Sequence, residues 1–348
     1  MEIEVQSFED LKKKYKLSKN EEAFKGNQYT LPVSITKHFL SLINLEDEKD
    51  PLRIQVFPNA LEENEENLEN IDPLEEVNNT KSSRLIHRYE SRVALLTTDI
   101  CPMYCRHCFR RRFTGKLVGP ISNEEIQDAA DYIQKHPKIT EILLTGGDLL
   151  TLSDKKLDYL IKTLRNKNPK LIMRICTRMV ITAPSRVTDN LISIFKKYDS
   201  APFYLLTQVN HPRELDAKAI SAINKFVNAG IPALNQTVML KGVNDDFDTM
   251  EELCNKLLFN RVKPYYVFQG DLVSGTAHLR VNVNRTIEIE REMRKRLSGL
   301  AMPSFMIDLP KGGGKVPLSA CYLKDFSNNT YTFETVDGEE RKYPHIIN

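Results

Sequence analysis

Residues 92–112 read RVALLTTDICPMYCRHCFRRR, an apolar run followed by a loop in which Cys101, Cys105 and Cys108 have the spacing CxxxCxxC. Three thiolates in one loop can bind three irons of a [4Fe-4S] cluster, since each of these irons takes one cysteine ligand. The fourth iron then lacks a protein ligand and can bind a small molecule. The motif therefore predicts a cluster that takes part in chemistry rather than one that only relays electrons.

Structural zinc and three unrelated cysteines are the alternatives to a cluster. Structural zinc usually has four ligands in two closely spaced pairs. No second pair is present, because each remaining cysteine stands alone in the sequence: Cys176, Cys254 and Cys321. The triplet is therefore more typical of an iron–sulfur site.

The composition is that of a globular protein of 348 residues, 41% of them hydrophobic, long enough for one large α/β domain or two smaller ones. No apolar run approaches the ~20 residues that span a bilayer. Residues 1–16, MEIEVQSFEDLKKKYK, also lack the order of a signal peptide. We therefore expect no membrane association and a cytoplasmic location, where reducing conditions suit a thiolate-bound cluster.

The net charge of +2 does not indicate a nucleic-acid partner. Positive charge is nevertheless concentrated in the cysteine loop. We attribute this charge to anionic ligands near the cluster, with a solvated basic loop as the alternative. The arginines concerned are Arg106, Arg110, Arg111 and Arg112.

Apolar β-type runs alternate with amphipathic helical patterns from residue 92 onward. This alternation indicates a parallel sheet covered by helices. Right-handed connections curl such a sheet into a partial or full barrel, with functional residues at the carboxyl ends of the strands. The predicted class is α/β, with a partial (β/α)6-type TIM barrel. The six runs cover residues 92–100, 140–148, 170–177, 203–210, 231–240 and 262–271.

The chain is expected to have a cap before the barrel and a short tail after it. The cap contains two segments with helical spacing, LKKKYKLS (11–18) and ITKHFLSLINL (35–45), followed by an acidic stretch, 60–76. The tail contains NNTYTFETVDGEERKYP (328–344), which predicts one β-hairpin with an Asp-Gly turn. The predicted regions are an N-terminal helical cap (1–86), the barrel (87–322) and the C-terminal hairpin tail (323–348).

The sequence TGGD places Gly146, Gly147 and Asp148 at the carboxyl end of the second run. Two glycines let a backbone approach a bound ligand closely and expose its N–H groups. A strand-to-helix turn also favours glycine, so the motif alone is weak. Its place one βα unit after the cysteine loop makes it a candidate ligand-binding turn.

The sequence DLPKGGGKVP (308–317) presents Lys315 on a flexible glycine turn. A lysine amine can form an imine with an aldehyde when burial or neighbouring cations lower its pKa. The alternative is a glycine-rich surface turn whose lysines are solvated.

Taken in order, these motifs resemble those of the lysine 2,3-aminomutase family of radical S-adenosylmethionine enzymes. The similarity extends from about Asp50 to Tyr322, and the joint order of the short motifs makes it specific. The resemblance implies a radical S-adenosylmethionine barrel with a [4Fe-4S] cluster, S-adenosylmethionine and pyridoxal 5′-phosphate. It also implies an isomerase that interconverts L-lysine and β-lysine by migration of the 2-amino group. The motifs are CPMYCRHCFRRRFTGK, LLTGGDLL, NHP, GVND, RVKPYYVFQGDL and IDLPKGGGKVP.

The resemblance also implies which residues bind the cofactors. Lys315 matches the lysine that forms the internal aldimine with pyridoxal phosphate. The segment HRYESR (87–92) matches the run that binds its phosphate, for which guanidinium groups are well shaped, with a surface ion pair as the alternative. The implied phosphate residues are Arg88, Tyr89 and Arg92. The implied S-adenosylmethionine residues are Gly146, Gly147, Asp148 and His107.

Three further positions are implied to select the substrate. Arg110 matches the arginine that binds the α-carboxylate, while Asp271 and Asp308 match two aspartates that bind the side-chain ammonium of lysine. Such opposed charges suit a molecule with a distal cation and a proximal anion. A glutamate-specific enzyme is not expected to place two acidic groups where the substrate's own carboxylate lies. Without the resemblance, either aspartate could be a helix cap or a loop residue.

The implied chemistry needs an electron donor for the cluster, such as flavodoxin or ferredoxin, and a homo-oligomer is also considered. Three alternatives remain among enzymes: a relative that makes β-lysine for modification of elongation factor P, a 2,3-aminomutase for another amino acid, and a radical S-adenosylmethionine enzyme without pyridoxal phosphate that modifies a protein or nucleic acid. A non-enzymatic iron–sulfur or zinc module is the fourth.

The sequence departs from the family pattern in several places. Pro102, Phe109 and Lys311 replace a serine, a threonine and a glycine. Only 33 residues follow Lys315, whereas longer members carry a further segment with a zinc-binding cysteine cluster. Zinc is therefore not expected, and the family's usual subunit association cannot be assumed.

Overall fold

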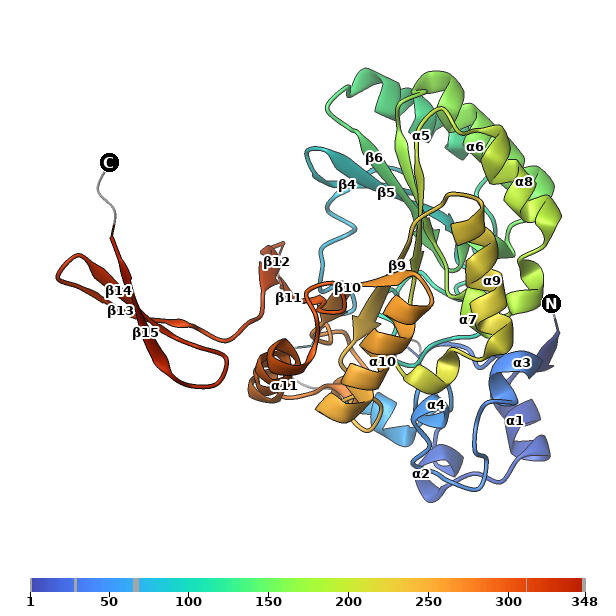
Figure 1. Cartoon of the computed structure of the whole chain (residues 1–348). Helices are drawn as coiled ribbons and strands as arrows, with labels where there is room; N and C mark the ends of the chain where they lie inside the picture. The colour runs from blue at the N-terminus through green and yellow to red at the C-terminus, as the bar shows by residue number, and fades with distance from the viewer. Residues whose placement is uncertain (1, 28–29, 65–68, 311, 346–348) are drawn as a thin grey trace.

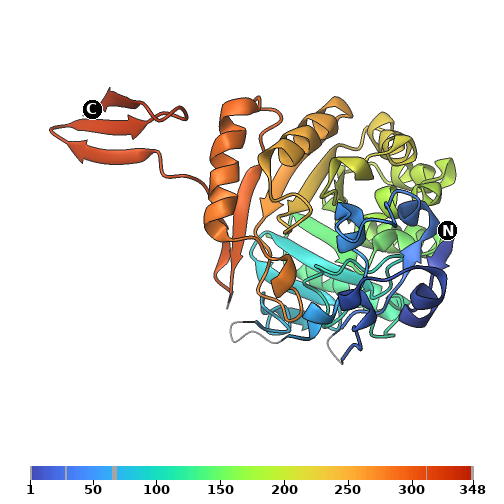
Figure 2. The same cartoon turned by 90° about the horizontal axis from the view of Figure 1, so that it is seen from below.

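The computed structural model describes residues 2–27, 30–64, 69–310 and 312–345. Its centre is a ten-stranded sheet in the order β12-β11-β10-β9-β8-β7-β6-β5-β4-β3, with helices on its outer face (Figures 1 and 2). Strands β5 to β11 run parallel to one another, and the strands at both edges are antiparallel.

All six runs predicted as strands form strands, and each pairs in parallel with the next. The predicted α/β class with a partial barrel is therefore confirmed. A seventh parallel strand, β11 (Ser304–Leu309), extends it and was not predicted. The six predicted strands are β5 (Arg92–Thr98), β6 (Glu141–Gly146), β7 (Ile172–Cys176), β8 (Phe203–Thr207), β9 (Ala233–Val238) and β10 (Val262–Phe268).

Alternation along each strand separates core side chains from those that face the inside of the barrel. In β6, Ile142 and Leu144 are fully buried in the main core, whereas Leu143 and Thr145 line an internal cavity. Burial of each such aliphatic side chain contributes about 1.5–3 kcal/mol. The main core therefore lies between the sheet and its helices, and the inner face is left to line the cavity.

Helices follow the strands as βα units. Side-chain caps mark where they begin: Ser122 accepts a hydrogen bond from the Glu125 amide, and the Glu125 carboxylate accepts one from the Ser122 amide. The covering helices are α5 (Asn123–Lys135), α6 (Asp154–Lys167), α8 (Asp189–Lys197), α9 (Ala217–Asn228), α10 (Phe247–Phe259) and α11 (Val283–Arg296). A single turn, α7 (Met179–Thr182), precedes α8.

The edges of the sheet approach each other without backbone pairing between them in the described part of the chain. One edge consists of β3 (Thr80–Ser82) and β4 (Leu85–Tyr89), and the other is β12 (Gly314–Pro317). Side chains bridge this seam, since Arg88 Nη1 of β4 lies 3.2 Å from Asp308 Oδ1 of β11. The main-chain hydrogen bonds therefore do not close the barrel among the described residues.

The N-terminal region contains the two predicted helical segments, but they are short and share the region with a small sheet. Strands β1 (Ile3–Val5) and β2 (Ile35–Thr36) pair antiparallel, because Val5 and Ile35 are apolar and become fully buried there. The helices are α1 (Phe8–Lys14), α2 (Lys19–Glu22), α3 (Lys37–Leu40) and α4 (Pro51–Ile54). In Figure 1 these elements lie at the lower end, and α3 packs against α7.

The C-terminal tail forms a three-stranded antiparallel sheet that projects from the barrel in both views (Figures 1 and 2). The predicted hairpin with its Asp-Gly turn joins β14 to β15, and a further strand, β13, pairs with β14. The extra turn is made by Asn328 and Asn329, with φ of 50° and 54°, values that asparagine tolerates in tight hairpins. The strands are β13 (Leu323–Ser327), β14 (Thr330–Glu334) and β15 (Glu340–Pro344).

The predicted boundaries after residues 86 and 322 stay predictions, although the sheet already includes β3, ahead of the first of them. Among the described residues, no helix is both long and apolar enough to cross a membrane. Lys311 lies outside the described residues.

Candidate active site

One cavity of about 420 Å³ lies inside the barrel, lined by strands and by the loops that follow β5 to β8. This volume suits small-molecule ligands. Every site residue expected from the sequence lines it: Arg88, Tyr89, Arg92, Cys101, Cys105, His107, Cys108, Arg110, Gly146, Gly147, Asp148, Asp271, Asp308 and Lys315. The structure therefore brings the motifs together, while their individual roles stay predictions.

The three cysteines of the loop all line the cavity. Burial raises the pKa of the Cys101 and Cys108 thiols, so both are neutral without a metal. Within the described ranges, no three cysteine, histidine or acidic side chains are placed to share one metal ion. A [4Fe-4S] cluster distributes three thiolates over three irons, so thiols spread around one cavity fit the cluster.

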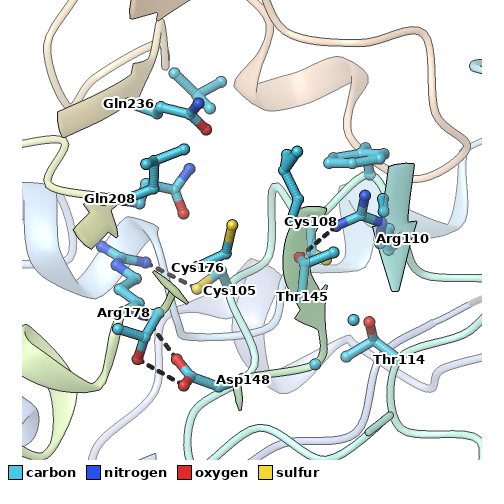
Figure 3. A pocket seen from close by; sticks show the side chains of 18 of the residues that line it. Cys105, Cys108, Arg110, Thr114, Thr145, Asp148, Cys176, Arg178, Gln208 and Gln236 are labelled. Carbon is cyan, nitrogen blue, oxygen red and sulfur yellow. Dashed lines mark hydrogen bonds between the residues drawn. The ribbon is translucent and has the colours of Figure 1, made fainter. Parts of the chain in front are cut away.

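A buried arginine contacts the middle cysteine. Arg178 Nη1 donates to Cys105 Sγ at 2.8 Å, as Figure 3 shows. Its Nη2 donates to Glu214 Oε2 at 2.8 Å and to Gln55 Oε1 at 2.6 Å, and both of these partners are fully buried. A guanidinium fixed in this way lies against a proposed cluster ligand, and hydrogen bonds to sulfur tune the potential of a cluster.

The TGGD turn packs directly on the cysteine loop. A Cβ atom at Gly147 would lie 2.3 Å from the carbonyl oxygen of Ile100, so only glycine fits between the two backbones. The expectation that this turn exposes its N–H groups to a ligand is wrong for Gly147 and Asp148. Their N–H groups donate to the carbonyl oxygens of Thr98 and Ile100, because the turn is hydrogen-bonded to the loop itself.

Asp148 joins this turn to the end of the next strand. Its carboxylate accepts hydrogen bonds from Thr177 Oγ1 at 2.6 Å, the Arg178 amide at 2.7 Å and the Leu150 amide at 3.0 Å. Burial raises the pKa of Asp148, although these hydrogen bonds oppose the shift. The side chain therefore holds the turn after β6 and the loop after β7 together at the wall of the cavity.

Two arginines of the cysteine loop are paired with a buried glutamate. Glu62 accepts from Arg106 Nε at 2.7 Å and Nη2 at 2.6 Å, and from Arg111 Nη2 at 2.9 Å. Burial acts to raise the pKa of Glu62, but the two guanidinium groups together hold this pKa below its usual value. The glutamate is thus ionised and fixes the base of the loop.

The other two arginines share a second buried glutamate. Glu76 Oε1 lies 2.9 Å from Arg110 Nη2, and Glu76 Oε2 lies 3.0 Å from Arg112 Nη2. The acidic stretch 60–76 thus supplies carboxylates to all four arginines, so the loop's positive charge does not by itself require anionic ligands. Of the four, Arg110 also lines the cavity, where a ligand can reach it. Residues 65–68 of the acidic stretch lie outside the described part of the chain.

Lys315 lies in β12 opposite Asp308 of β11. Its Nζ is 2.6 Å from Asp308 Oδ2 and 5.3 Å from the centre of the Phe268 ring. Arg88 Nη1 reaches the other oxygen of Asp308 at 3.2 Å. Asp308, predicted to bind the ammonium of a substrate, thus binds an ammonium and a guanidinium of the protein itself.

Two donors beside the glycine turn are buried without a partner in the described part of the chain: Arg88 Nη2 and the Tyr89 hydroxyl. Arg92 stacks on the Tyr89 ring at 3.8 Å from its centre. The Tyr89 hydroxyl lies 4.0 Å from the Cβ position of Gly314, next to Lys315. Unpaired buried donors are costly unless a ligand accepts from them. Their place beside a lysine fits the phosphate and aldehyde of pyridoxal phosphate.

Asp271 makes no hydrogen bond or ion pair within the described residues, although it lines the cavity. Burial raises the pKa of Asp271 to about 7, and the charge of Asp308 adds to this effect, while Lys315 opposes it. A carboxyl group in this situation gains most from a ligand that carries a positive charge.

His107 is neutral, because burial and the nearby charge of Arg178 lower its pKa to about 3. Its Nδ1 has no partner in the described part of the chain, and the same holds for the hydroxyls of Thr114, Thr182 and Thr207, which also line the cavity. This wall therefore offers unused polar groups to a ligand.

Four residues of the site were not predicted from the sequence: Glu76, Thr145, Cys176 and Arg178. Strand alternation could have found Thr145 and Cys176, since each lies near the carboxyl end of a predicted strand and faces the cavity. Burial raises the pKa of Cys176 to about 12, so its thiol is neutral. No local pattern marks Glu76 or Arg178.

Comparisons with known proteins agree with this site. Residues 95–255 match the Radical SAM superfamily, and residues 289–345 match the family Lysine-2,3-aminomutase. The L-lysine 2,3-aminomutase of Clostridium subterminale is 41% identical over 345 residues, which cover 99% of this chain and 82% of that protein. The chain belongs to the lysine 2,3-aminomutase family.

Other relatives extend the comparison. The L-lysine 2,3-aminomutase of Acetoanaerobium sticklandii is 40% identical over 96% of this chain and 80% of that protein. The glutamate 2,3-aminomutase of Clostridioides difficile is 38% identical over 88% of this chain and 72% of that protein. Members of the lysine 2,3-aminomutase family with different substrates are thus almost equally similar, so the substrate has to be argued from the cavity.

Proposed function

We propose that this chain is a radical S-adenosylmethionine, pyridoxal phosphate-dependent aminomutase that interconverts L-lysine and β-lysine. The supporting observation is one cavity that contains the cysteine loop, Lys315 and charged groups for both ends of the substrate. Arg110 offers donors to the α-carboxylate. Asp271 and Asp308 offer acceptors to the side-chain ammonium.

The cofactors are assigned to residues around this cavity. Bound there, they supply a hydrogen-abstracting radical and a carbonyl that carries the migrating amino group. The proposed cluster ligands are Cys101, Cys105 and Cys108. The residues proposed to border S-adenosylmethionine are Gly146, Gly147, Asp148 and His107. The residues proposed for pyridoxal phosphate are Lys315, Arg88, Tyr89 and Arg92.

The chain's own residues would hold the substrate in contact with the reacting groups and keep water out. Orientation at contact distance supplies a large share of rate enhancement in such reactions. The apolar lining limits water and stray hydrogen donors. It includes Ile86, Val93, Leu143, Leu206, Val238 and Phe268.

The charges of the cavity favour lysine over glutamate. Asp271 and Asp308 are close enough for the charge of Asp308 to raise the pKa of Asp271. A third carboxylate, from the side chain of glutamate, would add to this repulsion, whereas an ammonium relieves it.

We further propose that the enzyme works in the cytoplasm and receives electrons from a low-potential donor such as flavodoxin or ferredoxin. Use of β-lysine for modification of elongation factor P concerns the fate of the same product and predicts the same reaction.

The test is anaerobic reconstitution with iron and sulfide, followed by incubation with pyridoxal phosphate, S-adenosylmethionine, dithionite and either L-lysine or L-glutamate. We expect β-lysine from L-lysine, detected by mass spectrometry, and no β-glutamate. Cys105→Ala should lose the cluster and all turnover.

Each other result has a definite meaning. If 5′-deoxyadenosine forms without β-lysine, the radical chemistry stands and the substrate is wrong. If neither product forms in protein with full iron content, the assignment itself is wrong. Turnover by Cys105→Ala would contradict the role of the cysteine loop.

A further inference from the structure

A segment of eight residues, 69–76, contacts the two loops that carry Asp271 and Arg110, the groups proposed to bind opposite ends of the substrate. We call it the acidic strap. At one end, Glu69 pairs with Arg280 and accepts from the Gly275 amide at 3.2 Å. At the other end, Glu76 pairs with Arg110. The strap therefore connects the loop after β10, which carries Asp271, with the cysteine loop.

The strap is joined to the loop after β10 by main-chain hydrogen bonds. The Asn70 amide donates to the Leu272 carbonyl oxygen at 2.9 Å, and the Ser274 amide donates to the Asn70 carbonyl oxygen at 3.2 Å. Leu272 directly follows Asp271 in the sequence. These main-chain hydrogen bonds couple the position of Asp271 to the strap, and they do not depend on any side chain.

Glu76 binds one edge of the Arg110 guanidinium. It accepts from Nε at 3.0 Å and from Nη2 at 2.9 Å. On the opposite side, Nη1 donates to Thr145 Oγ1 at 2.8 Å, and Figure 3 shows Arg110 directed at this hydroxyl. The plane of the guanidinium is therefore held from two sides.

The donors that remain on Arg110 match a second carboxylate. A guanidinium has five N–H donors. Glu76 takes the one on Nε and one on Nη2, and Thr145 takes one on Nη1. One N–H is left on each terminal nitrogen, and these two form the pair that a bidentate carboxylate needs when Thr145 takes the Nη1 hydrogen directed away from Nη2. Glu76 and a substrate carboxylate can therefore bind Arg110 at the same time.

Glu76 itself has little freedom to move. It is 7% exposed, and its Oε2 also accepts from Arg112 Nη2 at 3.0 Å. Asp72 of the strap also binds Arg112, with Oδ1 at 3.1 Å from Nε. The preceding residue, Glu75, has φ of 52°, a left-handed conformation that non-glycine residues rarely adopt. The backbone thus turns sharply to place the Glu76 carboxylate inside.

We propose that Glu76 is a positioning residue, which fixes Arg110 so that two of its N–H groups face the α-carboxylate of the substrate. This inference rests on the proposed function, in which Arg110 binds that carboxylate. Without the Glu76 charge, Arg110 loses its side-on partner and its orientation, and only ligands that carry the carboxylate bind less tightly.

The test compares Glu76→Gln with the unmodified enzyme, both loaded with cluster and pyridoxal phosphate. L-lysine and 1,5-diaminopentane, which is lysine without its α-carboxylate, are titrated while the absorbance of the bound pyridoxal phosphate is followed. We expect the Kd for L-lysine to rise about tenfold or more, as for loss of a charge-assisted hydrogen bond. The Kd for 1,5-diaminopentane should stay within about twofold.

A second variant and a matched control separate positioning from a general structural role. Thr145→Val removes the other hydrogen-bond partner of Arg110 without changing the charge. It should also weaken the binding of L-lysine and not that of 1,5-diaminopentane. Glu48→Gln removes an exposed charge that does not line the cavity, and should leave both Kd values unchanged. In an Arg110→Ala background, Glu76→Gln should cause no further loss of L-lysine affinity.

Three results would overturn the inference: equal weakening of both ligands by Glu76→Gln, no weakening of L-lysine, or a further loss of L-lysine affinity in the Arg110→Ala background. In each case the unmodified enzyme still binds L-lysine, so the proposed function stands. If the unmodified, fully loaded enzyme does not bind L-lysine, the proposed function fails and the inference fails with it.

Discussion

Asp271 is a carboxyl group whose charge is disfavoured by its buried place in the cavity wall. Burial is the main reason that its pKa is about 7, and Asp308 contributes further. Near neutral pH the group is therefore balanced between its neutral and charged forms. A bound ammonium would shift this balance towards the charged form, so binding and ionisation are linked.

This linkage predicts that affinity for L-lysine increases as pH rises through about 7. Below that pH Asp271 is protonated, and binding has to remove the proton, which weakens affinity by up to about tenfold per pH unit. Titration of the loaded enzyme with L-lysine between pH 6 and 8.5 checks this. Asp271→Asn should lose the inflection, and an unchanged profile in that variant would assign it to another group.

The raised pKa of Asp271 has the opposite consequence for stability: the folded protein should become less stable as the pH rises. The pKa of Asp271 is raised from 3.8 to about 7, so its stabilising contribution is complete below pH 3.8 and is lost as pH rises through 7. We expect the Tm of Asp271→Asn to rise relative to the Tm of the unmodified protein when the pH is raised from 6 to 8. Thermal unfolding of both proteins at the two pH values measures the difference, and a constant difference would contradict it.

Lys315 is the second residue whose role can be tested alone. Lys315→Ala should abolish covalent retention of pyridoxal phosphate after borohydride reduction, because no other amine then lies opposite Asp308 in the described β11–β12 pair. Iron content should not change. Intact-protein mass spectrometry reads the retention, and Lys311→Ala, in the same glycine-rich sequence, is the control that should keep it. Retention in Lys315→Ala would assign the attachment to a different lysine.

At the scale of elements, the site depends on the contact between the TGGD turn and the cysteine loop. The two pack backbone against backbone at Gly147 and Ile100. Strand β6 therefore shapes the loop that is proposed to carry the cluster, although neither Gly146 nor Gly147 has a side chain that could contact a ligand.

A methyl group at this contact should disturb the loop. Gly147→Ala would place Cβ 2.3 Å from the Ile100 carbonyl oxygen, so the loop has to move. We expect a loss of about 1–3 kcal/mol in the free energy of unfolding, as for overpacked sites, and lower iron content after reconstitution. Denaturant unfolding and iron analysis measure both.

The matched substitution is Gly299→Ala, where nothing lies within 4 Å of the added Cβ. This variant should behave like the unmodified protein. If Gly147→Ala also keeps its stability and its iron, the packing of the two backbones does not shape the loop.

At the scale of the whole molecule, the C-terminal sheet is an appendage of the barrel. Strands β13 to β15 pair only with one another among the described strands. The side chain of Glu334 forms an ion pair with Arg291 of α11 and so ties the appendage to the barrel.

Truncation after Tyr322 should therefore leave a folded barrel. We expect the truncated chain to bind iron in the same ratio and to keep its Tm within a few degrees, since the main core includes no residue beyond 322. This experiment also tests the predicted boundary at that position. A barrel that fails to fold would show that the tail belongs to the same cooperative unit.

The sequence could predict the barrel strands because each is a short segment rich in apolar, aromatic or β-branched residues, which local composition reveals. It could not predict the counter-charges of the cysteine loop. Glu62 lies 44 residues from Arg106, and Glu76 lies 34 residues from Arg110. An acidic run has the same composition whether it is solvated or buried against arginines, so only the folded chain distinguishes the two.

The site was predictable where residues form motifs and less so elsewhere. The cysteine triplet and the glycine-rich turn were found from spacing and chemistry, whereas Asp271 and Asp308 depended on a family resemblance. Strand β11 was missed because its six residues directly precede the glycine-rich turn and include Asp308, so the segment was interpreted only as a motif.

The seam between β4 and β11 implies an order of assembly. Asp308 binds two cations of the protein itself, Lys315 and Arg88. Both are proposed to engage the cofactor, and Asp308 then has no internal cation and is free to accept one from outside. Lysine should therefore bind tightly only after the cofactor is in place. Because coupling between two ligands is reciprocal, bound lysine should in turn slow the loss of the cofactor, so that the enzyme is most completely assembled when its substrate is abundant.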